Sequence, residues 1–232
     1  MKINLLPGIP DDDNRDYLPE YLKDSEIVVN ENGNNSQVYP KRLEEKKGAL
    51  VDEFVDTWYQ YVPESYNPEK KTPVVFSMHG GLMTGWAQAV YTSWTHIADR
   101  EGFICIFPNA QLRRFWTIEC EDKLYKELSA PNEEGIYMNP VPPIEENHDV
   151  LVVFALIEKL KKEYNIDEER IYMQGMSCGN AMTTMMARHF GNKFAAMEGS
   201  AGPGTMGLMF REDGTPNNLS LIHISEPTRL RR

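Results

Sequence analysis

The fold is decided by one stretch of the chain, Ile171-Tyr172-Met173-Gln174-Gly175-Met176-Ser177-Cys178-Gly179. Its first four residues form a short, mostly apolar run that is typical of a strand buried on both faces of a sheet. Beyond the second glycine, methionines recur at helical spacing in residues 182–186. A strand, a tight turn and a helix in this order predict a serine at the apex of a strained turn, with its hydroxyl projecting above the sheet.

This arrangement gives each residue of the turn a predicted role. Ser177 is the candidate catalytic nucleophile. Gly175 and Gly179 avoid a Cβ where the strand and the helix nearly touch. The N-terminus of the helix places partial positive charge beside a developing oxyanion, and the backbone N–H of Cys178 is one expected oxyanion donor. Cys178 is not the expected nucleophile, because the serine holds the apex of the turn.

A second motif, His79-Gly80-Gly81, follows the apolar run Pro73-Val74-Val75-Phe76-Ser77-Met78. A loop of this kind, after an earlier strand, supplies the other backbone N–H of an oxyanion hole. Glycines let such a backbone approach the substrate oxygen closely. We therefore expect Gly81 to be the second donor, with His79 and Gly80 shaping the loop. His79 is expected to brace this loop rather than to act as a base.

The wider pattern predicts an α/β fold with a mostly parallel sheet flanked by helices. Short apolar runs predict strands, and apolar residues at helical spacing predict helices between them. Residues 111–146 break this rhythm and are expected to be a long insertion. The predicted strands span 57–62, 73–78, 103–107, 171–174 and 194–197, and the predicted helices span 86–98, 150–164 and 182–189.

The composition of the chain limits the classes of partner and cofactor that it is expected to bind. The chain has 232 residues, of which 41% are hydrophobic, and a formal net charge of -11. That charge disfavours nucleic acid and anionic membranes as partners. The three cysteines, Cys105, Cys120 and Cys178, show neither a zinc pattern nor a disulfide framework, so no metal and no cofactor is expected. No signal peptide or membrane segment is visible, which predicts a cytoplasmic protein, or an extracellular one if the true start lies upstream.

Several segments together resemble a known family. These are Asp149-Val150, residues 164–167, residues 170–172 and the turn at Ser177. They are similar to the polyhydroxybutyrate-depolymerase-like esterases, which are related to feruloyl and acetyl-xylan esterases in the α/β-hydrolase superfamily. The resemblance covers about residues 57–203. It implies hydrolysis of carboxylic esters by a Ser-His-Asp triad through an acyl-enzyme, with Ser177 as nucleophile and Gly81 and Cys178 as oxyanion donors.

The resemblance also shapes the expected substrate. Many relatives carry a glycine where Asn180 stands here, and many are secreted and disulfide-bonded. A small-molecule or carbohydrate-linked ester is therefore expected rather than a polymer. Two alternatives stay open: a serine peptidase or dienelactone-hydrolase-like enzyme on the same fold, and a non-catalytic binding module that keeps the fold.

The end of the chain does not fit the family. In this superfamily the acid and then the histidine follow the serine along the chain. Only His189 and His223 follow Ser177, and residues 219–229 resemble the translation of a transposon-end sequencing adapter. We therefore predict an acidic N-terminal extension at 1–50, an incomplete hydrolase domain at 51–218 without its last strands, and a non-native tail at 219–232. The acid and base would then be missing, and this chain would be inactive.

Overall fold

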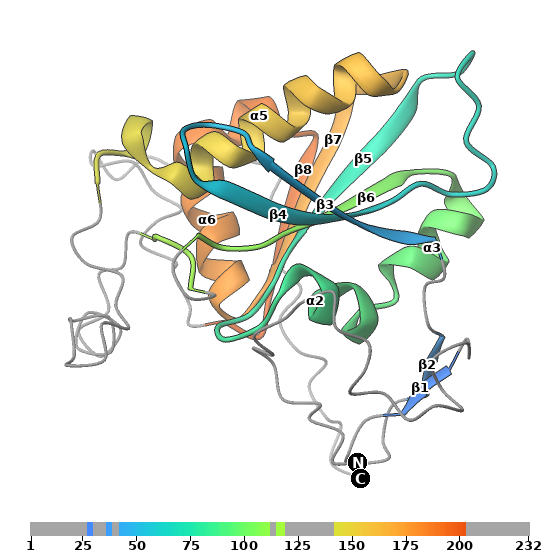
Figure 1. The fold of residues 1–232 in the computed structure, drawn as a ribbon, viewed down its shortest axis with the longest axis horizontal. Helices are drawn as coiled ribbons and strands as arrows, with labels where there is room; N and C mark the ends of the chain where they lie inside the picture. Colours follow the sequence, from blue (N-terminus) through green and yellow to red (C-terminus); the bar gives the residue numbers. More distant parts are fainter. Residues whose placement is uncertain (1–26, 30–35, 39–41, 112–114, 119–141, 203–232) are drawn as a thin grey trace, which may run out of the picture.

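The computed structural model describes residues 27–29, 36–38, 42–111, 115–118 and 142–202 (Figure 1). Its centre is a six-stranded sheet with the strand order β3-β4-β6-β5-β7-β8. A separate pair of short strands, β1 (Ile27–Val29) and β2 (Ser36–Val38), is antiparallel. The strands of the main sheet are β3 (Leu43–Ala49), β4 (Val55–Tyr61), β5 (Thr72–Met78), β6 (Ile104–Pro108), β7 (Ile166–Met176) and β8 (Ala196–Ser200).

Four neighbouring strands of this sheet are parallel, which places their carboxyl ends along one edge. β5 pairs in parallel with β6 and β7, and β7 pairs in parallel with β8. β3 and β4 are antiparallel to their neighbours. The register aligns Met78 with Gly175 and Met176 with Ser200. The loops that follow β5, β7 and β8 therefore meet at this edge, where open α/β sheets bind their ligands.

Helices cover both faces of the sheet. α5 (His148–Glu163) and α6 (Cys178–Phe190) lie on one face, and α2 (Gly85–Tyr91) and α3 (Trp94–Glu101) lie on the other (Figure 1). Two single-turn 3₁₀ helices, η2 (Ile144–Glu146) and η3 (Gly191–Lys193), precede α5 and follow α6. None of the helices in the described ranges combines the length and the apolar character that crossing a membrane requires.

The apolar strand runs divide between two cores because successive side chains point to opposite faces. On β5, Val74, Phe76 and Met78 pack with α5 and α6, whereas Val75 packs with α2 and α3. Phe76 and Ile106 are fully buried, and each such side chain contributes about 1.5–3 kcal/mol. Burial on both faces explains why these strands show continuous rather than alternating hydrophobicity.

The α/β class with a mostly parallel, helix-flanked sheet is confirmed, with differences in detail. The helix predicted over 86–98 is two helices, because Thr92 leaves the helical conformation with φ -99° and ψ 162°. The last predicted strand begins two residues later, at Ala196.

The sheet also contains β3, which lies inside the N-terminal extension of weak structure predicted for residues 1–50. In the described sheet β3 is an edge strand that pairs with β4 alone, and its side chains are largely half-exposed or exposed. Its sequence is therefore polar and lacks the apolar run from which the other strands were predicted. Much of the predicted insertion at 111–146 and all of the predicted non-native tail lie outside the described residues.

Candidate active site

Ser177 lies between the end of β7 at Met176 and the start of α6 at Cys178. Its backbone has φ 55° and ψ -115°, a conformation that is strained for a residue with a Cβ. Its N–H donates to the Ser200 carbonyl at 2.9 Å, and its own carbonyl accepts from the Asn180 N–H at 3.0 Å. The Ser177 side chain is exposed. The chain thus turns sharply at residue 177 and presents the hydroxyl to solvent.

Gly175 and Gly179 stand where the elements of this turn are closest. A Cβ on Gly175 would lie 1.9 Å from the carbonyl oxygen of Gly179, and one on Gly179 would lie 2.1 Å from that of Met78. Both obstacles are backbone atoms, which cannot rotate away as a side chain can. The two glycines therefore allow β7, α6 and the end of β5 to approach within contact distance.

The loop after β5 lies against the nucleophile. A Cβ on Gly80 would be 3.5 Å from Cβ of Ser177, and one on Gly81 would be 3.7 Å from Cβ of Cys178. The structure thus brings together the residues that the sequence proposed as nucleophile, Ser177, and as oxyanion donors, Gly81 and Cys178. Cys178 opens a helix of 13 residues, whose N-terminal partial charge faces the same place.

His79 is fully buried and both ring nitrogens are engaged. Nε2 lies 3.0 Å from the backbone N of Ala110, and Nδ1 lies 2.7 Å from the Gly80 carbonyl oxygen. A backbone N–H can only donate, so Nε2 accepts and the proton of the neutral ring is on Nδ1, which donates to Gly80. The ring also packs against Trp116, with centroids 4.6 Å apart. This histidine braces the loop and does not face Ser177 as a base.

The other described histidines do not reach the nucleophile either. His148 is held by two carboxylates, with Nε2 2.7 Å from Asp56 and Nδ1 3.1 Å from Asp52. The pKa of Asp52 is lowered, mainly by the N–H of Phe54 and also by His148. His96 and His189 are exposed. Within the part of the chain that the structure describes, no residue accepts a hydrogen bond from the Ser177 hydroxyl; His223 lies outside it.

Two contributions near the site were not predicted from the sequence. Trp116 donates from Nε1 to the His79 carbonyl at 2.7 Å. Asp149, which was named above only as part of the family resemblance, accepts the backbone N–H groups of Gln111 and Thr117 at 2.9 and 2.7 Å. Burial raises the pKa of Asp149, and these two N–H groups oppose that shift. Both contacts join residues more than 30 positions apart, so no local pattern of the sequence indicated them.

In the described ranges, no three histidine, cysteine or acidic side chains gather as a metal site. Cys105 and Cys178 are buried and form no disulfide bond in the described part of the chain, and burial raises the pKa of the Cys105 thiol. Cys120 lies outside the described residues.

The strand order, the flanking helices and the sharp turn at a serine define the α/β-hydrolase fold. The solved structure of acetyl xylan esterase from Aspergillus awamori matches with a TM-score of 0.50 and 18% identity, covering 76% of this chain and 57% of that one. At that level of identity the match supports the fold alone.

Sequence comparison finds homologues in the groups that the resemblance named. A bifunctional acetylxylan esterase/xylanase from Neocallimastix patriciarum is 29% identical over 147 residues, which cover 63% of this chain and 18% of the relative. Acetylxylan esterase A from Emericella nidulans is 28% identical over 141 residues, covering 60% and 40%. A feruloyl esterase B and a poly(3-hydroxyalkanoate) depolymerase C also match, at 26% and 23% identity.

These matches confirm the resemblance to acetyl-xylan and feruloyl esterases and to depolymerases of the polyhydroxybutyrate type. The aligned part of the chain spans less than half the length of these relatives. No protein-family model matches the chain.

Proposed function

We propose that this chain carries the nucleophile and the oxyanion hole of a serine hydrolase that cleaves carboxylic esters. The exposed, strained position of Ser177 between β7 and α6 is the observation that carries the proposal. The loop at Gly80 and Gly81 lies beside it, and the homologues are named as esterases. We further propose that the substrate is a small-molecule or carbohydrate-linked ester.

In the proposed reaction the Ser177 oxygen attacks the ester carbonyl carbon and its proton passes to a base. The carbonyl oxygen becomes an oxyanion that accepts hydrogen bonds from the N–H groups of Gly81 and Cys178. Collapse of this intermediate releases the alcohol, which takes the proton, and leaves an acyl group on Ser177. Water then attacks the acyl carbon, and the acid is released as the serine is restored.

We propose that the base and its acidic partner are not among the described residues. His79 and His148 already engage both ring nitrogens. Hydrolases that lose a triad member keep about 10³–10⁴-fold catalysis over water, because the oxyanion hole still acts. Removal of the acyl group also needs the base. Where no base reaches Ser177, the serine should therefore be acylated slowly by an activated ester and should hold the acyl group with little turnover.

The test is acetylation by p-nitrophenyl acetate, followed by peptide mass spectrometry. We expect one acetyl group on the peptide that contains Ser177, and none there in Ser177→Ala. Ser93 is a matched control, because it is also an exposed serine at a helix N-cap. Ser93→Ala should not change the labelling. Equal acetylation of Ser93 and Ser177 would overturn the proposed function, since it would show that the turn does not activate its serine.

A further inference from the structure

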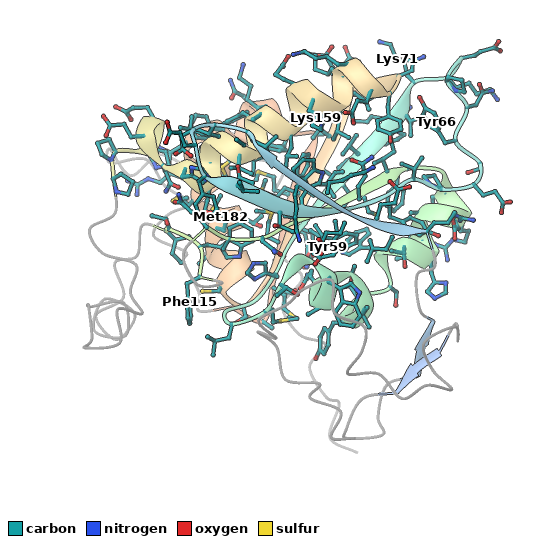
Figure 2. All side chains as sticks on the ribbon, in the orientation of Figure 1. Tyr59, Tyr66, Lys71, Phe115, Lys159 and Met182 are labelled. Atoms are coloured by element: carbon teal, nitrogen blue, oxygen red, sulfur yellow. The ribbon has the colours of Figure 1, made fainter. Side chains whose placement is uncertain are left out.

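The segment that follows β6 covers the oxyanion loop. We call residues 109–111 and 115–118 the covering segment. Its Ala110 N–H and its Trp116 Nε1 both bind His79, at the ring and at the carbonyl. The ring of Phe115 lies so close that a Cβ on Gly81 would be 2.9 Å from its Cε1 atom. Figure 2 shows the labelled Phe115 near α6, on which Met182 is labelled. The position of His79 and Gly81 therefore depends on this segment.

The covering segment is itself held by the N-terminus of α5. Asp149 accepts from the backbone N–H of Thr117 through Oδ2, and Asn147 donates from Nδ2 to the carbonyl of the same residue, both at 2.7 Å. The other carboxylate oxygen of Asp149 accepts from Gln111 at 2.9 Å. One helix end thus holds both polar groups of the Thr117 backbone and a second point on the segment.

Asp149 is not explained by capping the helix. Asn147 is the N-cap, and its side chain accepts from Val150. Asp149 is 2% exposed and turns its carboxylate toward the covering segment. A carboxylate offers acceptors on both oxygens and no donor, which matches two converging N–H groups. An asparagine would present its NH₂ group to one of them.

We propose that Asp149 is a positioning residue for the oxyanion hole. Through Gln111 and Thr117 it fixes the covering segment, which fixes His79 and, with it, the N–H of Gly81 relative to that of Cys178. This inference rests on the proposed function of Ser177 for its catalytic meaning. Its structural part, a coupling between the N-terminus of α5 and the oxyanion loop, stands on the contacts alone.

The first test reads the indole N–H signals in a ¹⁵N NMR spectrum of the full chain. Trp116→Phe assigns the Trp116 signal. In Asp149→Asn we expect this signal to shift, because the hydrogen bond from Nε1 to His79 is displaced. The signal of Trp94, which packs in the other core and donates from Nε1 to Gln174 at 3.1 Å, should stay in place as an internal control. A folded variant with an unchanged Trp116 signal would overturn the proposal.

A second variant guards against a general loss of structure. Asn147→Asp keeps an acceptor for the helix cap but loses the Nδ2 donor to Thr117. We expect the Trp116 indole and the backbone amides of Gly80 and Gly81 to shift, with the helix preserved by circular dichroism. A shift of Trp116 without any shift of the two glycine amides would overturn the proposal, because the segment would then move without moving the loop.

The catalytic consequence is measured by the rate of acetylation of Ser177 by p-nitrophenyl acetate. In Asp149→Asn we expect the maximal rate to fall about 10- to 100-fold, with the half-saturating ester concentration unchanged. An unchanged maximal rate would overturn the positioning role. If the parent chain itself is not acetylated at Ser177, the proposed function fails, and the NMR experiments still decide the coupling.

Discussion

The closest backbone approach at the candidate site gives a sharp prediction for Gly175→Ala. The new Cβ would lie 1.9 Å from the Gly179 carbonyl oxygen and 2.5 Å from Thr183 Oγ1, and real Cβ contacts are essentially never under 3.0 Å. β7 and α6 must therefore separate by about 1 Å. Overpacking of this kind costs about 3 kcal/mol or more. For a domain of this size the midpoint of thermal unfolding should fall by about 6–12 °C.

The matched control for this change is Gly48→Ala in β3. A Cβ on Gly48 meets only the Trp58 ring, at 3.8 Å, which is an ordinary contact. This variant should unfold within about 1 kcal/mol of the parent. Urea titrations followed by circular dichroism measure both free energies of unfolding. If Gly175→Ala were no less stable than Gly48→Ala, β7 and α6 would not approach as closely at Gly175 as described. The description of the turn that positions Ser177 would then also be refuted.

Three further predictions concern strain and charge at the same edge of the sheet. Ala201 has φ 51°, so Ala201→Gly should raise the free energy of unfolding by up to about 1 kcal/mol; a destabilised variant would contradict the strain. Ser177→Gly should be stabilised in the same way and lose acetylation, whereas Ser177→Ala should lose acetylation without gaining stability. The pKa of Asp149 is raised in the folded state, so the folded protein holds that proton more tightly than the unfolded chain does. The stability difference between the parent and Asp149→Asn should therefore shrink as pH rises above about 4, as pH-dependent urea titrations can show; a difference that grows with pH would contradict the shift.

The sequence predicted the central part of the fold because its strands are buried on both faces. Three short, mostly apolar runs lie between segments with helical spacing, at residues 73–78, 103–107 and 171–174. Each of these runs is part of a strand in the structure. β3 was not predicted, since its charged residues, half-exposed or exposed at the edge of the sheet, give it no apolar run. The break between α2 and α3 was also missed, because it depends on Thr92, whose hydroxyl donates to the Gln88 carbonyl at 2.8 Å.

The residues of the candidate site that belong to a short motif could be predicted from the sequence, whereas those that act through contacts between distant positions could not. Gly175 and Gly179 could be found because their role depends on neighbours in the chain and on a strand-turn-helix pattern. The contact of Trp116 with His79 joins positions 37 residues apart, and that of Asp149 with Thr117 joins positions 32 apart. No local pattern encodes such pairs. Their roles follow only from the packing of α5 against the segment after β6.

The strain in this structure lies where the proposed chemistry would occur. Among the described residues, the non-glycine positions with positive φ are Leu82, Ser177 and Ala201. Each follows a strand, and the three strands end at the same edge of the sheet. Such conformations cost about 1–3 kcal/mol each and persist only where the surroundings enforce them. Here the Ser200 carbonyl holds the Ser177 N–H, so the strained turn after β8 supports the strained turn after β7. A fold selected for stability alone would place glycine at these positions; one that must expose a serine hydroxyl beside Gly81 cannot do so at residue 177.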